Sequence, residues 1–307
     1  MSIQVTDLLK VYGSQKAVDH ISFHVNKGEI VGFLGPNGAG KSTTMKILTG
    51  YLQADGGTCS VCDIDVATDP IGVKKRIGYL PELNALYYDM YVREYLGFIA
   101  SLHKVGHARL AIEKTISLVG LERESGKKLG QLSKGYKQRV GLAASLIHQP
   151  EVLILDEPTS GLDPNQIVEI REVIRQQGKD KTVLFSSHIL QEVEAICDRV
   201  IIINKGTLVA DDKLANLREQ SVSNIVKVEF KEEVPEELFN NLPALQSKIN
   251  TNTNNWQLAT ADPESLRKQI LELALQHNLN IVSLQSENRS LEDIFRTLTQ
   301  EAVTASI

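Results

Sequence analysis

The 307-residue sequence has no apolar run that approaches the ~18–20 residues needed to span a bilayer. Residues 200–203, Val-Ile-Ile-Ile, are typical of its apolar runs and suit a buried strand. The first seven residues lack the basic start and apolar core of a secretion signal. The chain has 33 Lys and Arg against 38 Asp and Glu, which argues against a nucleic-acid-binding surface. We therefore expect a cytosolic protein with no nucleic-acid partner, whose contact with a membrane comes through another subunit.

Cysteine is also scarce, with three in the chain. Cys59 and Cys62 form a C-x-x-C, but a zinc site needs a second pair of ligands, and the remaining Cys197 is far away in the sequence. The order Cys-Ser-Val-Cys also alternates as in a strand. Both cysteines are therefore expected to be small strand residues, and metal or redox chemistry is the alternative that the spacing leaves open.

Residues 35–43 fit the phosphate-binding pattern G-x-x-x-x-G-K-[ST] at every fixed position. The apolar residues 30–34 predict a buried strand before this loop, and residues 43–49 predict a helix after it. Glycines allow the tight turn that directs backbone N–H groups at a polyphosphate, and the helix adds its positive end. Lys41 would hold the β- and γ-phosphates, and Ser42 would ligate Mg²⁺. The predicted nucleotide-binding residues of the loop are Gly35, Pro36, Asn37, Gly38, Ala39, Gly40, Lys41, Ser42 and Thr43.

A second set of functional residues follows two apolar stretches later in the chain. Four apolar β-formers precede Asp156 and Glu157, which predicts a buried parallel strand with two carboxylates at its C-terminal edge. Because ligands of open α/β sheets bind at that edge, Asp156 is expected at the Mg²⁺ site and Glu157 as the residue that activates water. Residues 183–187 predict another strand, and His188 at its end is a candidate γ-phosphate contact.

Between these two sets the hydrophobic periodicity is helical, from Met90 to Leu121, and Ser133 is a good N-cap for a further helix. The composition changes near residue 220, and residues 221–224 are predicted as a linker. The elements expected after it follow the order β-α-β-β-α-β with an extra helix, which predicts a small ferredoxin-like unit.

These motifs, in this order, make roughly residues 2–215 resemble the nucleotide-binding subunits of ABC transporters. By that resemblance, residues 35–43 are the Walker A loop. Asp156 and Glu157 are the Walker B aspartate and the catalytic glutamate, and His188 is the switch histidine.

The other landmarks of the family also have counterparts in this sequence. Tyr12 corresponds to the aromatic residue that stacks on adenine. Glu82 stands where the family usually has the Q-loop glutamine, and we expect it at the metal site with Ser42 and Asp156. Ser133 and Gly135 lie in the signature motif. Asp163 belongs to the D-loop.

The resemblance implies an α/β fold of the P-loop NTPase class and the ABC ATPase type. Its expected parts are a parallel sheet core, an antiparallel β subdomain and a helical subdomain at about residues 85–135. The predicted domains are residues 1–220 for the ATPase and 221–307 for a small α+β ferredoxin-like domain. Residues 290–295 resemble a segment of ABC-2-type export ATPases, and residues 79–95 resemble ATPases associated with gliding motility.

The family's mechanism implies ATP and Mg²⁺ as cofactors. It also implies a homodimer in which each ATP lies between the Walker A loop of one subunit and the signature helix of the other. Lys41, Glu157 and His188 would be the catalytic residues. ATP-driven closure would move a separate transmembrane permease, which would hold the ATPase on the cytoplasmic face of the plasma membrane. Family members contact the permease through the helical insert and the loop at Glu82.

Two departures from the family pattern bear on turnover. Glu82 replaces glutamine and brings a carboxylate toward a polyphosphate. The signature reads Leu-Ser-Lys-Gly-Tyr, so Lys134 adds a positive charge that would offset Glu82, and Tyr136 removes a polar contact.

Three alternatives remain at this point. A soluble ABC ATPase acting on DNA or ribosomes usually has two cassettes or a long coiled coil, and neither is present. A GTPase reads guanine through Asn-Lys-x-Asp, and Asn204-Lys205-Gly206-Thr207 lacks the Asp. The Glu82 and Lys134 variations also fit a nucleotide-binding scaffold without catalysis.

Overall fold

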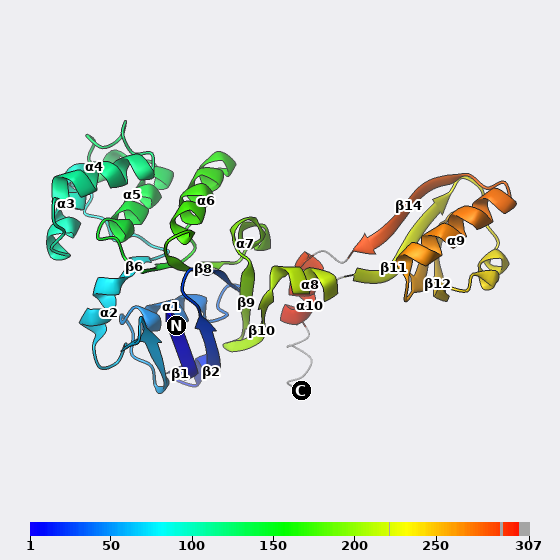
Figure 1. Ribbon diagram of the computed structural model, residues 1–307, viewed down its shortest axis with the longest axis horizontal. Coiled ribbons are helices and arrows are strands. Elements are labelled where there is room, and N and C mark those ends of the chain that lie inside the picture. Colours follow the sequence, from blue (N-terminus) through cyan, green and yellow to red (C-terminus); the bar gives the residue numbers. More distant parts are fainter. Residues whose placement is uncertain (221, 289–290, 301–307) are drawn as a thin grey trace. The chain divides into compact units, whose positions relative to one another are not determined.

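The computed structural model describes residues 1–220, 222–288 and 291–300. The described chain divides into two units, residues 1–214 together with 297–300, and residues 215–296. Figure 1 shows the elements of both, coloured along the chain. Among the described residues, no helix combines the length and the apolar character needed to cross a membrane.

Six strands form the central sheet of the first unit, in the order β10-β9-β3-β8-β7-β6. Neighbours from β9 to β6 pair in parallel, and β10 is antiparallel on the edge. Every residue of β7 and β8 is buried, as expected of parallel strands covered on both faces. The strands are β3 (Ile30–Leu34), β6 (Ile77–Leu80), β7 (Val152–Leu155), β8 (Thr182–Ser187), β9 (Arg199–Asn204) and β10 (Thr207–Lys213).

A second, antiparallel sheet of the first unit has the order β2-β1-β4-β5. Its strands are β1 (Ile3–Tyr12), β2 (Gln15–Val25), β4 (Gly56–Val61) and β5 (Ile64–Asp65). The core joins this sheet to the parallel one, and the rings of Phe23 and Phe33 lie 5.5 Å apart. Cys59 lies buried in β4 as predicted, but the prediction that Cys62 is a strand residue is wrong, because it follows the strand in a turn at φ 51°. The predicted core sheet and β subdomain are thus confirmed.

Helices cover the parallel sheet and form the predicted helical insert. The long helical run expected from Met90 to Leu121 is two helices, because Lys104 and His107 between them take positive φ. Ser133 caps the next helix as predicted, accepting a hydrogen bond from the N–H of Tyr136. The helices are α1 (Lys41–Leu48), α2 (Pro70–Arg76), α3 (Val92–Leu102), α4 (Ala108–Leu118), the short η1 (Leu129–Gln131), α5 (Lys134–Leu146), α6 (Pro164–Gly178) and α7 (Leu190–Ile196).

The second unit holds an antiparallel sheet with the order β12-β13-β11-β14. This order and the packing of α9 on one face confirm the ferredoxin-like prediction, although the first helix is a short 3₁₀ turn, η2. The rings of Phe239 and Trp256, 4.7 Å apart, lie in its core. The elements are β11 (Val222–Phe230), η2 (Glu236–Asn241), β12 (Leu245–Asn252), β13 (Asn255–Thr260), α9 (Pro263–Gln276) and β14 (Ile281–Asn288).

The junctions of the units differ from the sequence expectation. The helix α8 (Leu214–Gln220) begins where the first unit ends. The linker predicted at residues 221–224 is wrong for 222–224, because β11 already pairs with β14 from Val222, with a bulge before Ile225. Ser221 and Ser290 lie outside the described residues. The helix α10 (Leu291–Gln300) ends in the first unit, where the Asn204 side chain donates to the Thr299 carbonyl at 2.8 Å.

Two stacked histidines join the helical insert to the sheet. His103 follows α3, and its ring lies 3.8 Å from that of His148, with 19° between the planes. The Nε2 of His148 contacts the Ile77 carbonyl at 3.0 Å, so it carries the proton and donates. Burial, and then the neighbouring His103, lower the pKa of His148 to about 4. Lys74 is the charged side chain that lines the same groove.

We expect this histidine to make the fold less stable in mild acid. Below the ordinary histidine pKa of about 6.5, His148 binds a proton in the unfolded chain but stays neutral in the folded one. The free energy of unfolding therefore decreases as the pH drops from 6.5 toward 4. His148→Gln keeps a donor for Ile77 and removes this titration. Its melting temperature should therefore fall less between pH 7 and pH 5 than that of the natural chain. Exposed His277→Gln is the control, and equal acid sensitivity in all three chains would contradict the assignment.

Candidate functional site

The glycine-rich loop lies between β3 and α1, as the sequence predicts. Gly38 and Gly40 take φ of 78° and 111°, which side chains rarely adopt. A Cβ on Gly40 would come within 2.4 Å of the Ala17 carbonyl oxygen, and one on Gly35 within 2.3 Å of the Ile203 carbonyl oxygen. The loop therefore needs glycine for conformation at Gly38, for space at Gly35 and for both reasons at Gly40.

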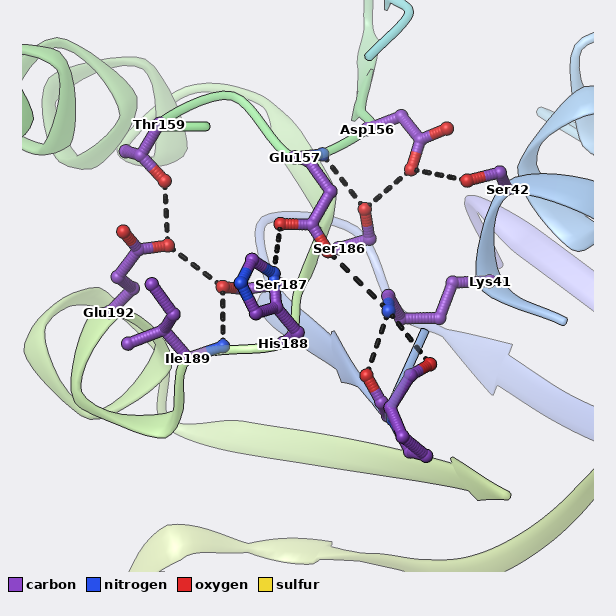
Figure 2. Close-up of polar contacts among 12 residues, drawn as sticks. Lys41, Ser42, Asp156, Glu157, Thr159, Ser186, Ser187, His188, Ile189 and Glu192 are labelled. Carbon is purple, nitrogen blue, oxygen red and sulfur yellow. Dashed lines mark hydrogen bonds and ion pairs between the residues drawn. The ribbon is translucent and has the colours of Figure 1, made fainter. Parts of the chain in front are cut away.

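Lys41 is buried at the base of this loop (Figure 2). Its Nζ donates to the carbonyl oxygens of Gly35 at 2.7 Å and Pro36 at 3.2 Å. The same ammonium lies 3.4 Å from Glu157 Oε1, and both side chains are less than a tenth exposed. A buried cation is thus balanced by a carboxylate that follows β7 and lies 116 residues later in the chain (157 − 41).

Asp156 is held by two hydroxyl groups at the end of β7 (Figure 2). Its Oδ1 accepts from Ser42 Oγ at 3.1 Å and from Ser186 Oγ at 2.7 Å. A hydroxyl and a carboxylate side by side offer oxygen ligands of the kind that Mg²⁺ prefers. Mg²⁺ usually binds one or two carboxylates and completes its coordination shell with phosphate and water. Among the described residues, no cluster of three His, Cys, Asp or Glu side chains could hold a metal by itself. These donors therefore fit an ion that arrives with a polyphosphate.

Glu157 and His188 meet directly. The Nδ1 of His188 lies 2.8 Å from Glu157 Oε2, and with the carboxylate ionised this nitrogen is the donor. The backbone of Glu157 has φ 49°, a left-handed conformation that costs a residue with a side chain free energy. Ser186 Oγ accepts from the Glu157 N–H at 2.9 Å and so stabilises this conformation. Ser186 belongs to the site although the sequence analysis selected His188 alone from that strand end.

A cavity of about 440 Å³ lies over these groups. Ala17 and Ser160 in its wall were not predicted, because neither belongs to a pattern with a known phosphate role. Glu82 is exposed and does reach this cavity. The predicted residues that line it are 37–43, Glu82, Glu157 and His188.

The remaining predicted residues lie elsewhere. Gly35, Pro36 and Asp156 support the cavity through the hydrogen bonds above. Tyr12 is half exposed at the end of β1, with the Lys10 ammonium 5.7 Å from its ring. The structure does not bring Ser133, Gly135 or Asp163 into the wall of this cavity: Ser133 and Gly135 begin α5, and Asp163 caps α6 by accepting from Gln166 N–H at 3.0 Å.

Lys134 in the variant signature lies against a neighbouring loop of its own chain. A Cβ on Gly161 would come within 2.0 Å of Lys134 Nζ. Similarly, a Cβ on Gly135 would meet the Gln166 side chain at 2.3 Å. The start of α5 thus packs on the loop before α6 and on the first turn of that helix. The expected effect of the Lys134 charge on a triphosphate stays a prediction.

The comparisons with known proteins agree with this geometry. Residues 18–160 match the family model for ABC transporters, and residues 213–299 match that of the C-terminal domain of DrrA1-3-like ATP-binding proteins. The bacitracin transport ATP-binding protein BcrA of Bacillus licheniformis is 41% identical over 71% of this chain and 72% of its own length. The Nod factor export ATP-binding protein I of Burkholderia orbicola is 33% identical over 95% of this chain and 98% of its own.

The chain belongs to the ATP-binding subunits of ABC transporters.

Solved structures place this ABC ATPase in the same fold. A structure described as the ATP-binding subunit of an ABC transporter is 31% identical, with a TM-score of 0.66 over 72% of this chain and 93% of its own. CbiO1 of Clostridium perfringens, described as part of the CbiONQ complex, is 28% identical, with a TM-score of 0.63 over 69% and 88%. The ABC ATPase is therefore an ATP-binding and ATP-hydrolysing transporter subunit, and its relatives are consistent with an ABC-2-type exporter. The likeness of residues 79–95 to gliding-motility ATPases stays a prediction.

Gly40→Ala should weaken ATP binding by the ABC ATPase. The new Cβ would overlap the Ala17 carbonyl at a positive φ, and relief of about 1–3 kcal/mol of strain would shift the loop. We expect roughly a tenfold higher dissociation constant for ATP, measured by titration calorimetry. Gly28→Ala is the matched control, since Gly28 has φ 79° but open space around it. It should lower the melting temperature and leave binding unchanged. Equal binding by both variants would show that the loop tolerates the Cβ.

Proposed function

We propose that this ABC ATPase drives a separate permease of an exporter through ATP-dependent pairing of two copies. The observation that carries the proposal is a divided site. Lys41, Glu157 and His188 line one cavity, and Asp156 supports it through Ser42. The exposed Ser133, by contrast, caps a helix outside this cavity. A single chain thus presents the groups for phosphate and water, and a second chain would supply the signature helix.

In the resting site, Lys41 and Glu157 balance each other. The 3.4 Å contact and the bonds from Lys41 to two loop carbonyls occupy the ammonium. A triphosphate that entered the loop would compete for Lys41 with far more negative charge. We propose that Lys41 then turns to the β- and γ-phosphates and leaves Glu157 available for water.

Glu157 is proposed as the general base and His188 as its partner. A carboxylate near a polyphosphate attracts the proton of an attacking water, and the His188 N–H holds one carboxylate oxygen in place at 2.8 Å. His188 is nearly half exposed on the cavity side, so its free ring nitrogen can face the γ-phosphate. Tyr12 is proposed to stack on the adenine, because its ring is exposed at the end of β1.

Mg²⁺ is proposed as the metal, held by Ser42 and Asp156 together with phosphate oxygens. The ion would supply charge neutralisation between the β- and γ-phosphates. Ser186 keeps the Asp156 carboxylate oriented through its 2.7 Å hydrogen bond. Glu82 lines the same cavity and is proposed as a further oxygen ligand of the metal.

The permease is proposed to dock at a groove between β6 and the helices α3 and α5. This groove of about 300 Å³ is lined by Tyr79, Leu86, Tyr95, Ile99 and His148 among others. Tyr79 OH and His148 Nδ1 are buried there without a hydrogen-bond partner in the described structure. Burial, and then Asp156, raise the pKa of Tyr79, so it stays a neutral donor. Docking there would hold the ATPase on the cytoplasmic face of the membrane.

Two named relatives support the direction of transport and the second domain. Their names refer to bacitracin transport and Nod factor export, and the export relative matches nearly the whole chain. We propose that residues 1–220 act as the ATPase domain and residues 221–307 as an accessory domain of the exporter.

Glu157→Gln should separate ATP binding from hydrolysis. The amide keeps the size of the side chain but cannot accept a proton, so turnover should fall about 100-fold or more. ATP binding should persist, because the phosphate contacts of the loop are untouched. Phosphate release and ATP titration measure the two effects. Exposed Glu172→Gln, from a surface pair with Arg175, is the control and should behave as the natural chain. Unchanged hydrolysis in Glu157→Gln would remove Glu157 from the base role.

Mixing two inactive variants tests whether the site is shared. Lys41→Ala breaks the phosphate loop. Ser133→Asp keeps a good N-cap but places a negative charge where the signature helix would meet ATP. Each chain alone should hydrolyse ATP slowly. In a mixed head-to-tail dimer, one site takes its loop from the Ser133→Asp chain and its signature from the Lys41→Ala chain, and is intact. Hydrolysis should therefore return on mixing, and its absence under conditions where the chains pair would contradict the shared site.

A further inference from the structure

A buried carboxylate outside the cavity joins the two loops that carry Glu157 and His188. Glu192 in the first turn of α7 is 2% exposed. Its Oε2 accepts two hydrogen bonds, from Thr159 Oγ1 at 2.6 Å and from Ser187 Oγ at 2.8 Å (Figure 2). Burial of a carboxylate is costly unless hydrogen bonds compensate it, so short bonds from both hydroxyls are needed to keep it there.

The two hydroxyl groups belong to different segments, one next to Glu157 and the other next to His188. Thr159 follows Glu157 by two residues, and Ser187 directly precedes His188. Ser187 Oγ also accepts from the Ile189 N–H at 3.0 Å, which fixes the backbone on the far side of His188. One carboxylate oxygen therefore ties the segment after the proposed base to the segment around its histidine partner.

The backbone at Glu157 makes such a tie necessary. Its φ of 49° is unfavourable and persists only where the surroundings hold it on both sides. Ser186 holds the near side through the Glu157 N–H and Asp156. Thr159, bound to Glu192, holds the far side. Both sets of hydrogen bonds include a serine at the end of β8: Ser186 donates to Asp156, and the adjacent Ser187 donates to Glu192.

We propose that Glu192 is a positioning residue for ATP hydrolysis. Through Thr159 and Ser187 it keeps the Glu157 carboxylate and the His188 ring at hydrogen-bond distance, and it does not touch the nucleotide. This inference rests on the proposed role of Glu157. Loss of the tie lets the segment after Glu157 relax, which misplaces the base relative to water but leaves the phosphate loop unchanged.

The test removes the tie from either end. Thr159→Val deletes one hydroxyl at almost constant volume, and Glu192→Ala deletes the acceptor. For each, kcat should fall about tenfold or more, because small displacements of a catalytic group are costly. The dissociation constant for ATP should stay within about threefold. The Thr159→Val/Glu192→Ala double variant should be no slower than the slower single variant, since both changes break one link.

Two further variants separate positioning from general stability. Glu192→Gln can place its carbonyl oxygen where Oε2 lies and accept both hydrogen bonds, so it should recover most of the rate that Glu192→Ala loses. Thr115→Val removes another buried hydroxyl, bonded to Ala111 in α4 away from the site, and should keep full kcat. All rates are measured well below the lowest melting temperature in the set.

The inference fails if Thr159→Val keeps the kcat of Thr115→Val, or if the losses of the single variants multiply in the double variant. It also fails if ATP binding and kcat fall together. Should Glu192→Ala not fold, Thr159→Val and Glu192→Gln decide the question. Glu157→Gln is measured alongside. Unchanged hydrolysis in Glu157→Gln overturns the proposed base. If Glu157→Gln loses hydrolysis but Thr159→Val hydrolyses ATP at the natural rate, only the role of Glu192 is overturned.

Discussion

The strands β3, β8 and β7 pair in parallel, with Leu34 opposite Ser187 and Leu155 opposite Phe185. This register brings the three strand ends to one edge of the sheet. The phosphate loop leaves from the first strand, the serine pair and His188 from the second, and the carboxylate pair from the third. Because parallel neighbours align their carboxyl ends, residues more than a hundred positions apart in the sequence meet within hydrogen-bond distance.

The groups at this edge are charged and buried, so each depends on the others. Lys41 is compensated by Glu157 and two carbonyls, and Asp156 by two hydroxyls. Removal of one member leaves an uncompensated group in a poorly hydrated place, which costs more than the same change on the surface. We therefore propose that this network binds an anion by exchanging partners, and that a polyphosphate replaces the contact between Lys41 and Glu157.

Much of the fold follows from local patterns. The apolar runs before Gly35 and Asp156 are strands, and the β-α-β-β-α-β order after residue 221 is a ferredoxin-like sheet. The errors lie where backbone geometry overrides composition. Lys104 and His107 interrupt a continuous helical pattern with positive φ. Residues 222–224 belong to β11, in which Val222 pairs with Asn288, although they resemble a linker. Neither periodicity nor polarity reports such conformations.

The sequence by itself determined the chemistry of this protein. The loop of residues 35–43, Asp156, Glu157 and His188 predict a nucleotide site, because each combination has a local physical reason. The tertiary structure alone decided how these groups are held. It placed Glu157 in a left-handed conformation, made Ser186 its anchor and joined Thr159 to Ser187 through Glu192. Such bonds depend on strand register and on which side chains remain buried together, and no local pattern encodes either.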